Sequence, residues 1–163
     1  MKRLVSRAPP APSPRFIAYS FAGAALAIGG CGLLGQYSGS PWLMAPFGAS
    51  CVLVFGLPDS PLAQPRHVLG GHLLAALAGL LLLAVAGSSW WSAALAVALA
   101  LAVMQAARMV HPPAGATPLV VLASAANWHF LFTPVLAGSC LIVLLGWLVN
   151  RQRQRGSYPR YWW

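Results

Sequence analysis

The sequence predicts an all-α membrane protein of two inverted repeats, each with three helical segments of which the middle one is short and broken. Three observations predict this fold. Hydrophobic residues make up 59% of the 163 residues and charged residues only 7%, too few to cover the surface of a soluble domain. The apolar residues come in blocks of roughly 15 to 20, about the length that a helix needs to cross the hydrocarbon layer. The same order of blocks and breaks occurs twice.

The chain divides into one membrane domain and two tails. Residues 1–15 form a basic, proline-rich segment that we expect to be disordered and cytoplasmic. Residues 150–163 form a second basic tail, whose aromatic residues suit the lipid headgroup layer. Between the tails we expect a single transmembrane domain over residues 16–149, with repeat one over 16–86 and repeat two over 90–149.

Repeat one is predicted to begin with a full span from Phe16 to Gly35, whose many glycines and alanines allow close helix packing. The next apolar stretch, Pro41 to Leu57, is short, and its prolines and Gly48 oppose a helix at its beginning. We expect this stretch to enter as extended chain and to become helical near Phe47. A polar, proline-rich connection follows, and His67 to Ala86 is the second full span.

Repeat two follows the same plan. Trp90 to Ala107 is predicted to be a full span, opened by two tryptophans of the kind that favour the membrane interface. The short apolar stretch Ala114 to Ala126 is expected to become helical near Pro113, because proline is well tolerated at the first helical position. Phe130 to Val149 is the last full span.

Prolines and glycines recur at one constant offset. A shift of 67 positions lays Pro46 on Pro113, and the same shift pairs five further positions: Gly48 with Gly115, Ala49 with Ala116, Ser50 with Thr117, Gly71 with Gly138 and Gly79 with Gly146. These residue types mark backbone geometry, so their agreement indicates a duplication. The alternative is a shared membrane composition with glycines that match by chance.

The basic residues predict the orientation. If the short segments cross the membrane, the chain crosses six times and all ten lysines and arginines lie on the cytoplasmic side with both termini. If the short segments are re-entrant hairpins, Arg66 and Arg108 face the other side. The crossing arrangement fits better and makes the repeats inverted, a common plan of transporters with a midplane site. We expect a multi-pass protein of a bacterial inner (plasma) membrane.

The starts of the two short segments predict an anion site. In an inverted arrangement they converge near the midplane, where the free N–H groups of helix starts favour an anion. The expected substrate-binding residues from these segments are Gly48, Ala49, Ser50, Gly115, Ala116 and Thr117. The alternative is that both segments only pack against their neighbours, with each hydroxyl bonded to its own helix backbone.

Four basic side chains complete the predicted site. His72 and His111 are the ionisable groups closest to the breaks, and we expect them to tune the site or to carry a proton. Arg66 and Arg108 lie at the ends of spans, where they attract an anion toward an entrance, cap carbonyls or set the topology. The single acid, Asp59, is expected to pair with Arg66 or to cap a turn.

No catalytic, metal or cofactor site is predicted, and we expect no enzyme. The chain has no nucleophile motif and no paired carboxylates, and its three cysteines share no metal-ligand spacing. The net charge of +9 comes from the ends and two short loops, so we expect contact with anionic lipid headgroups and no nucleic-acid binding. The glycine-rich faces favour a homo-oligomer.

Several motifs together resemble a known family. The stretch from Arg108 to Thr117 reads RMVHPPAGAT, and four shorter motifs accompany it: PFGAS at 46–50, DSPLAQPR at 59–66, GGH at 70–72 and YPRYW at 158–162. They resemble the HPP family, named for its His-Pro-Pro, over residues 16–163. The resemblance implies a small integral membrane protein of bacteria, fungi or chloroplasts, with some members linked to nitrite movement. That family is usually described with four spans, whereas the residues predict six.

The residues therefore favour a membrane transporter or channel for a small inorganic anion, and the resemblance makes nitrite the best single candidate. Two alternatives stay open. One is a non-transporting membrane scaffold or sensor that acts through partner proteins, with the basic tails as its working part. The other is a channel for a small neutral solute.

Overall fold

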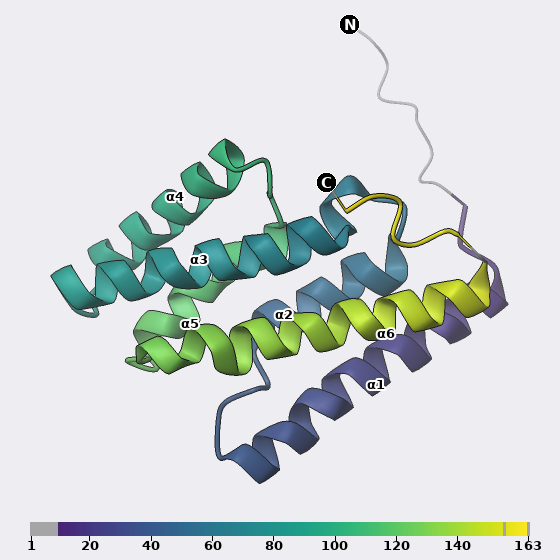
Figure 1. Cartoon of the computed structure of the whole chain (residues 1–163), viewed down its shortest axis with the longest axis horizontal. Coiled ribbons are helices and arrows are strands. Elements are labelled where there is room, and N and C mark those ends of the chain that lie inside the picture. The colour runs from purple at the N-terminus through teal and green to yellow at the C-terminus, as the bar shows by residue number, and fades with distance from the viewer. Residues whose placement is uncertain (1–9, 155, 163) are drawn as a thin grey trace, which may run out of the picture.

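The computed structural model of the chain is a bundle of helices (Figure 1), and it describes residues 10–154 and 156–162. Every regular element in these residues is a helix, which confirms the all-α prediction. Most of the expected disordered tail, residues 1–9, lies outside the described residues. The first helix already includes Pro14 and Arg15, because Ser13 caps its start by accepting from the backbone N–H of Phe16.

In the part of the chain that the structure describes, three helical stretches are long and apolar enough to cross a membrane. They are α1 (Pro14–Ser38), α3 (Pro65–Ala86) and the stretch Trp128–Arg153, which ends in α6 (Ala137–Arg153). The last stretch begins with a 3-10 turn over Trp128–Leu131 and a π turn over Phe132–Leu136. The helix α4 (Trp90–Ala106) is also apolar, but its 17 residues make it shorter than the predicted full span.

Both short segments have the broken form that the sequence predicts. The helix α2 (Ala45–Cys51) follows extended chain at Met44 and continues as a π turn over Val52–Gly56. The helix α5 (Thr117–Ala123) follows extended chain at His111 and a 3-10 turn over Pro112–Ala116. In each case a proline stands in the first turn, where its missing N–H is not needed.

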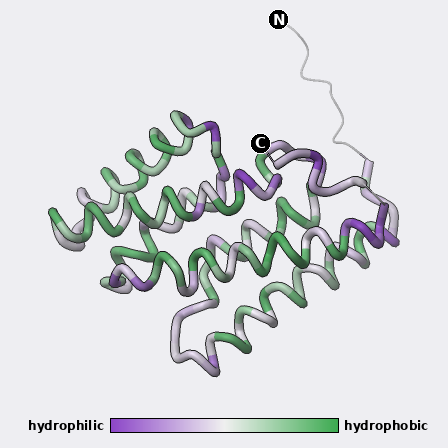
Figure 2. The backbone as a smooth tube through the Cα atoms, in the orientation of Figure 1, coloured by the Kyte–Doolittle hydropathy of each residue, from purple (hydrophilic) through white to green (hydrophobic). Residues whose placement is uncertain are grey.

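The start of α1, the described part of the C-terminal tail and the connection before α3 meet at one end of the bundle, which we call the basic end. Arg153 at the end of α6 donates to the hydroxyl of Ser20 in α1. Tyr158, which is only 3% exposed, donates to the carbonyl of Ala63. Burial raises the pKa of the Tyr158 phenol far above its usual range and keeps it a donor. Figure 2 shows hydrophilic residues gathered at this end and apolar residues along the helices.

The opposite end is formed by the turns after α1 and α5. One pocket there is lined by Gly39, Ser40 and Pro41 together with Ser124, Asn127 and neighbouring residues. At the basic end, Phe55 near the end of the first short segment accepts from Ser20 of α1. Each short segment therefore connects the two ends of the bundle and does not return to the end where it entered.

Glycines seat the long helices against the short segments. A Cβ on Gly79 of α3 would lie 2.9 Å from the Cα of Pro118 and 3.1 Å from the Cβ of Val121 in the second short segment. A Cβ on Gly146 of α6 would overlap the side chain of Val54 in the first short segment. The offset of 67 relates Gly79 to Gly146 and Val54 to Val121, so the two contacts correspond.

Candidate functional site

Four of the predicted site residues meet in one cluster, which we call the buried cluster: Ser50, His72, His111 and Thr117. All four are fully buried. Ser50 comes from α2, His72 from α3, His111 from the extended chain before the 3-10 turn, and Thr117 from the start of α5. The cluster therefore lies where the two short segments begin.

Short distances join the cluster into one chain of hydrogen bonds. Ser50 Oγ lies 2.8 Å from His72 Nε2 and 2.9 Å from His111 Nε2. His72 Nδ1 lies 3.0 Å from Thr117 Oγ1. At the other end, His111 Nδ1 lies 2.7 Å from the carbonyl oxygen of Leu62. Both ring nitrogens of both histidines are therefore engaged.

With both histidines neutral, one assignment of protons satisfies the whole chain. The carbonyl of Leu62 can only accept, so His111 carries its proton on Nδ1 and accepts at Nε2. Ser50 has one proton and donates it to His111, so it must accept from the Nε2–H of His72. His72 Nδ1 then accepts from the hydroxyl of Thr117. The bonds run in one direction, and the two histidines hold opposite tautomers.

The alternative in which Ser50 only bonds its own helix is less satisfactory. Ser50 Oγ lies 3.0 Å from the carbonyl of Pro46, one turn earlier. Donation to this carbonyl would leave His111 Nε2 buried without a donor, which costs about 1–3 kcal/mol. The directed chain avoids this cost.

The four small residues of the predicted site lie outside the cluster. Gly48 and Ala49 are exposed, and Gly115 and Ala116 are partly exposed. A Cβ built on Gly48 or Gly115 would meet nothing within 4 Å. An open pocket of about 450 Å³ lies between the two segments here, lined by Ala45, Pro46, Ala49, Leu53, Pro112, Pro113 and Ala116. Residues just before the buried hydroxyls thus point outward, because successive helical residues are turned by about 100°.

The two predicted arginines meet in a different pocket, which we call the basic pocket. It measures about 450 Å³, lies at the basic end and is lined by Leu62, Arg66, His67, Arg108, Val110 and Tyr161. Arg66 Nη2 donates to the carbonyl of Ala107, 3.1 Å away at the end of α4. Arg108 has a positive φ of 57°, which ends the helix there. Leu62 joins the two sites, since its carbonyl accepts from His111.

The sequence analysis did not include two members of these sites, and the structure gives Asp59 a partner other than Arg66. His67 lies in the basic pocket and bonds through Nδ1 to the carbonyl of Val110, 2.8 Å away. No sequence pattern identifies the backbone carbonyl of Leu62 as a hydrogen-bond acceptor, apart from its place in the proline-rich connection. Asp59 pairs with Arg160 and not with Arg66, because the C-terminal tail folds back over the connection before α3.

Comparison with known proteins decides the family. The sequence model of a family described as HPP, transmembrane region, matches residues 9–159, nearly the whole chain. The chain belongs to the HPP family. This confirms the predicted resemblance and makes the chain a membrane protein. In this HPP chain the His-Pro-Pro motif combines two roles: His111 closes the buried cluster, and Pro112 and Pro113 begin the second short segment.

Two relatives of this HPP chain come from Dictyostelium discoideum, and both are named as transmembrane proteins. One is 40% identical over 129 residues, which are 74% of this chain and 45% of the relative. The other is 38% identical over 130 residues, which are 75% of this chain and 42% of the relative. The chain thus spans less than half the length of these relatives. No solved structure matches it.

Proposed function

We propose that this HPP chain is a membrane transporter or channel for a small inorganic anion, with nitrite as the first candidate substrate. The observation that carries the proposal is the junction at Leu62. Leu62 lines the basic pocket, and its carbonyl ends the hydrogen-bond chain of the buried cluster. An anion attracted by Arg66 and Arg108 would therefore arrive beside groups that can donate hydrogen bonds and take up a proton.

The proposed arrangement is two inverted repeats that cross the membrane six times, with both termini on the cytoplasmic side of a bacterial inner membrane. The corresponding contacts of Gly79 with Val121 and of Gly146 with Val54 support it, because each repeat's last helix packs on the other repeat's short segment. The placement of Arg66 and Arg153 at the basic end supports the orientation.

The buried cluster is closed, so passage requires its hydrogen bonds to exchange. Ser50 and Thr117 each already bond a histidine, and an anion could take the place of these partners. A proton added to His111 would turn its Nε2 into a donor, break the directed chain at Ser50 and supply a positive charge. Nitrite is the anion of a weak acid and could move together with such a proton. No metal, cofactor or catalytic step enters this proposal.

We also propose that the chain forms a homo-oligomer. Gly48, Ala49, Gly115 and Ala116 lie on an open face beside irregular backbone. Irregular backbone at membrane depth is tolerated only where protein covers it or water fills a cavity. Small residues are also the type that lets helices of neighbouring subunits approach closely.

The test is anion entry into proteoliposomes containing the purified protein, compared among nitrite, nitrate, formate and chloride. The double variant Ser50→Val/Thr117→Val removes both hydroxyls, whereas Ser124→Val removes one that only bonds its own helix at Val120. We expect selective entry that the double variant loses and the control keeps.

Other outcomes would redirect the proposal. Selective entry that the double variant keeps would move the pathway away from the buried cluster. Absence of entry for every anion, from folded and inserted protein, would contradict transport and favour a scaffold or a channel for neutral solutes.

A further inference from the structure

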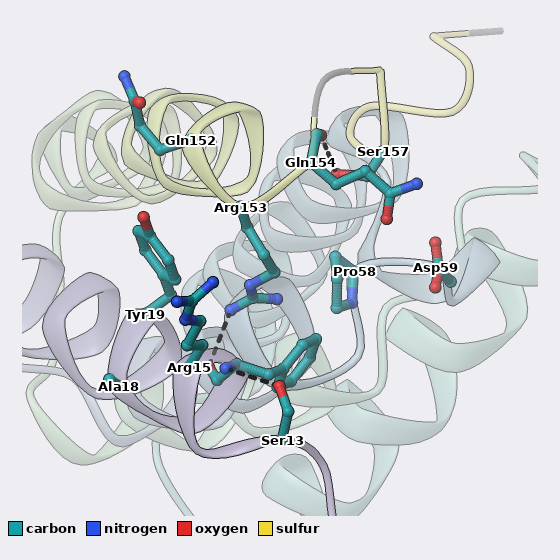
Figure 3. A pocket seen from close by; sticks show the side chains of 11 residues that line it. Ser13, Arg15, Ala18, Tyr19, Pro58, Asp59, Gln152, Arg153, Gln154 and Ser157 are labelled. Atoms are coloured by element: carbon teal, nitrogen blue, oxygen red, sulfur yellow. Dashed lines mark hydrogen bonds between the residues drawn. The ribbon is translucent and has the colours of Figure 1, made fainter.

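A separate cavity of about 580 Å³ opens at the basic end between the start of α1 and the end of α6 (Figure 3). We call it the Arg153 pocket, and its lining includes Ser13, Arg15, Tyr19, Asp59 and Arg153. Figure 3 shows Arg15 and Arg153 reaching toward each other from the two helices. The Arg153 pocket shares no lining residue with the basic pocket around Arg66 and Arg108.

Arg153 is held in place but is not fully satisfied. Its Nη2 donates to Ser20 Oγ at 2.9 Å and to the carbonyl of Phe55 at 3.0 Å, and its guanidinium stacks over the Phe16 ring at 3.7 Å. Its Nε and Nη1 are buried and have no hydrogen-bond partner in the described part of the chain. A guanidinium fixed in this way has unused donor capacity, which favours an additional acceptor nearby.

The charge in the pocket is unbalanced. The single acid of the chain, Asp59, lines the same pocket, but its carboxylate accepts from Nε of Arg160 at 2.9 Å and also from Nη2. Arg15 is exposed and Arg153 is partly buried, and neither has a salt bridge within residues 10–154 and 156–162. Two guanidinium groups in one cavity repel each other, and an anion between them would offset this repulsion by attracting both.

The depth of the pocket along the helices indicates which kind of anion it would bind. α1 begins at Pro14 and α6 ends at Arg153, so the pocket lies where the apolar part of both helices stops (Figure 2). In a membrane this is the layer of the lipid headgroups, and basic pockets between helices there bind phosphorylated headgroups. The planar fork of a guanidinium suits the oxygens of a phosphate. We propose that the Arg153 pocket binds the phosphate group of an anionic phospholipid headgroup.

Isothermal titration calorimetry of the full chain in detergent tests this site. The probes are short-chain phosphatidylglycerol, short-chain phosphatidylcholine and inorganic phosphate, at a salt concentration of about 0.5 M that screens general surface attraction. Arg15→Gln removes an exposed arginine of the pocket. Arg151→Gln is the matched control, because Arg151 is exposed at the same helix end and stacks on Trp147 outside the pocket.

We expect phosphatidylglycerol to bind and Arg15→Gln to weaken it about tenfold, the effect of one lost charge-assisted hydrogen bond. Arg151→Gln should change the affinity less than about twofold, as a side chain outside the pocket loses no direct contact. Phosphate binding as tight as that of phosphatidylglycerol, with the same Arg15 dependence, would support the phosphate site and assign it to a soluble phosphate. Equal weakening by both variants, or phosphatidylcholine binding as tight as phosphatidylglycerol, would overturn the proposal.

Discussion

The two short segments are packed alike but bonded differently. The first segment packs on Gly146 and the second on Gly79, through corresponding contacts. Ser50 in the first segment nevertheless hydrogen-bonds two histidines, whereas Thr117 in the second hydrogen-bonds one. The offset of 67 pairs His72 of α3 with Ser139 of α6, which bonds only backbone carbonyls of the π turn just before α6. The packing contacts thus follow the offset of 67, whereas the hydrogen bonds of Ser50 and His72 have no counterpart in the other half.

The largest difference between the halves should appear at the two hydroxyls. Ser50→Ala leaves the Nε2 atoms of both histidines without their partner, and we expect it to lower the free energy of unfolding by about 2–4 kcal/mol. Thr117→Val affects one ring nitrogen of His72 and should cost about 1–2 kcal/mol. Thermal unfolding in detergent measures both, with Ser124→Ala as a control that changes little. Equal losses at the two positions would contradict the directed chain.

The glycine contacts should instead respond alike in the two halves. Gly79→Ala and Gly146→Ala each force a methyl group into a neighbouring short segment, and overpacking of this kind costs about 1–3 kcal/mol. Gly29→Ala, whose Cβ would meet nothing within 4 Å, should be neutral or slightly stabilising. The same unfolding assay applies. A loss at one glycine without a loss at the other would show that the two contacts are not equivalent.

An effect of comparable size should separate the ends of the short segments. Asn150 of α6 is fully buried and donates through Nδ2 to the carbonyl of Val54 at 3.1 Å, in the π turn after α2. Asn150→Ala should cost about 1–3 kcal/mol, because the carbonyl of the fully buried Val54 loses this donor. The end of α5 is bonded by its own Ser124 and needs no such partner. Wild-type stability of Asn150→Ala would remove this distinction.

The smallest effect should come from the ion pair of Asp59 with Arg160. The two side chains are 66% and 56% exposed, and exposed pairs typically contribute less than about 1 kcal/mol. Asp59→Asn should therefore leave the unfolding midpoint nearly unchanged and should do so even more clearly at high salt. A large loss would mean that this pair holds the C-terminal tail on the bundle.

The sequence was sufficient for the broken segments because proline and glycine act locally. Pro46 and Pro113 mark where each segment becomes helical, and Ser50 and Thr117 follow in the next turn. The sequence analysis also selected the two histidines of the buried cluster. The sequence alone did not show that Gly48 and Gly115 face outward, since that depends on how each helix is rotated against its neighbours.

Long-range contacts set the limit of prediction. Asp59 pairs with Arg160 and not with Arg66, because the C-terminal tail folds back onto the connection before α3. The two paired residues are 101 positions apart in the sequence. The hydrogen bond from His111 to the Leu62 carbonyl could not be predicted, because every residue has a backbone carbonyl whatever its side chain. The basic pocket meets the buried cluster at that backbone group, and the link became visible only in three dimensions.

The most direct test records nitrite entry and lumen pH together in the same proteoliposomes. His111→Gln and His72→Gln keep a polar side chain in the buried cluster but remove the imidazole ring to which the proposal assigns proton transfer. His129→Gln is the control, since His129 lies at the opposite end of the bundle. We expect nitrite and protons to enter together in wild type and control, with the protein-dependent part of both lost in the two variants. Undiminished entry of nitrite in His111→Gln would contradict a pathway through the buried cluster.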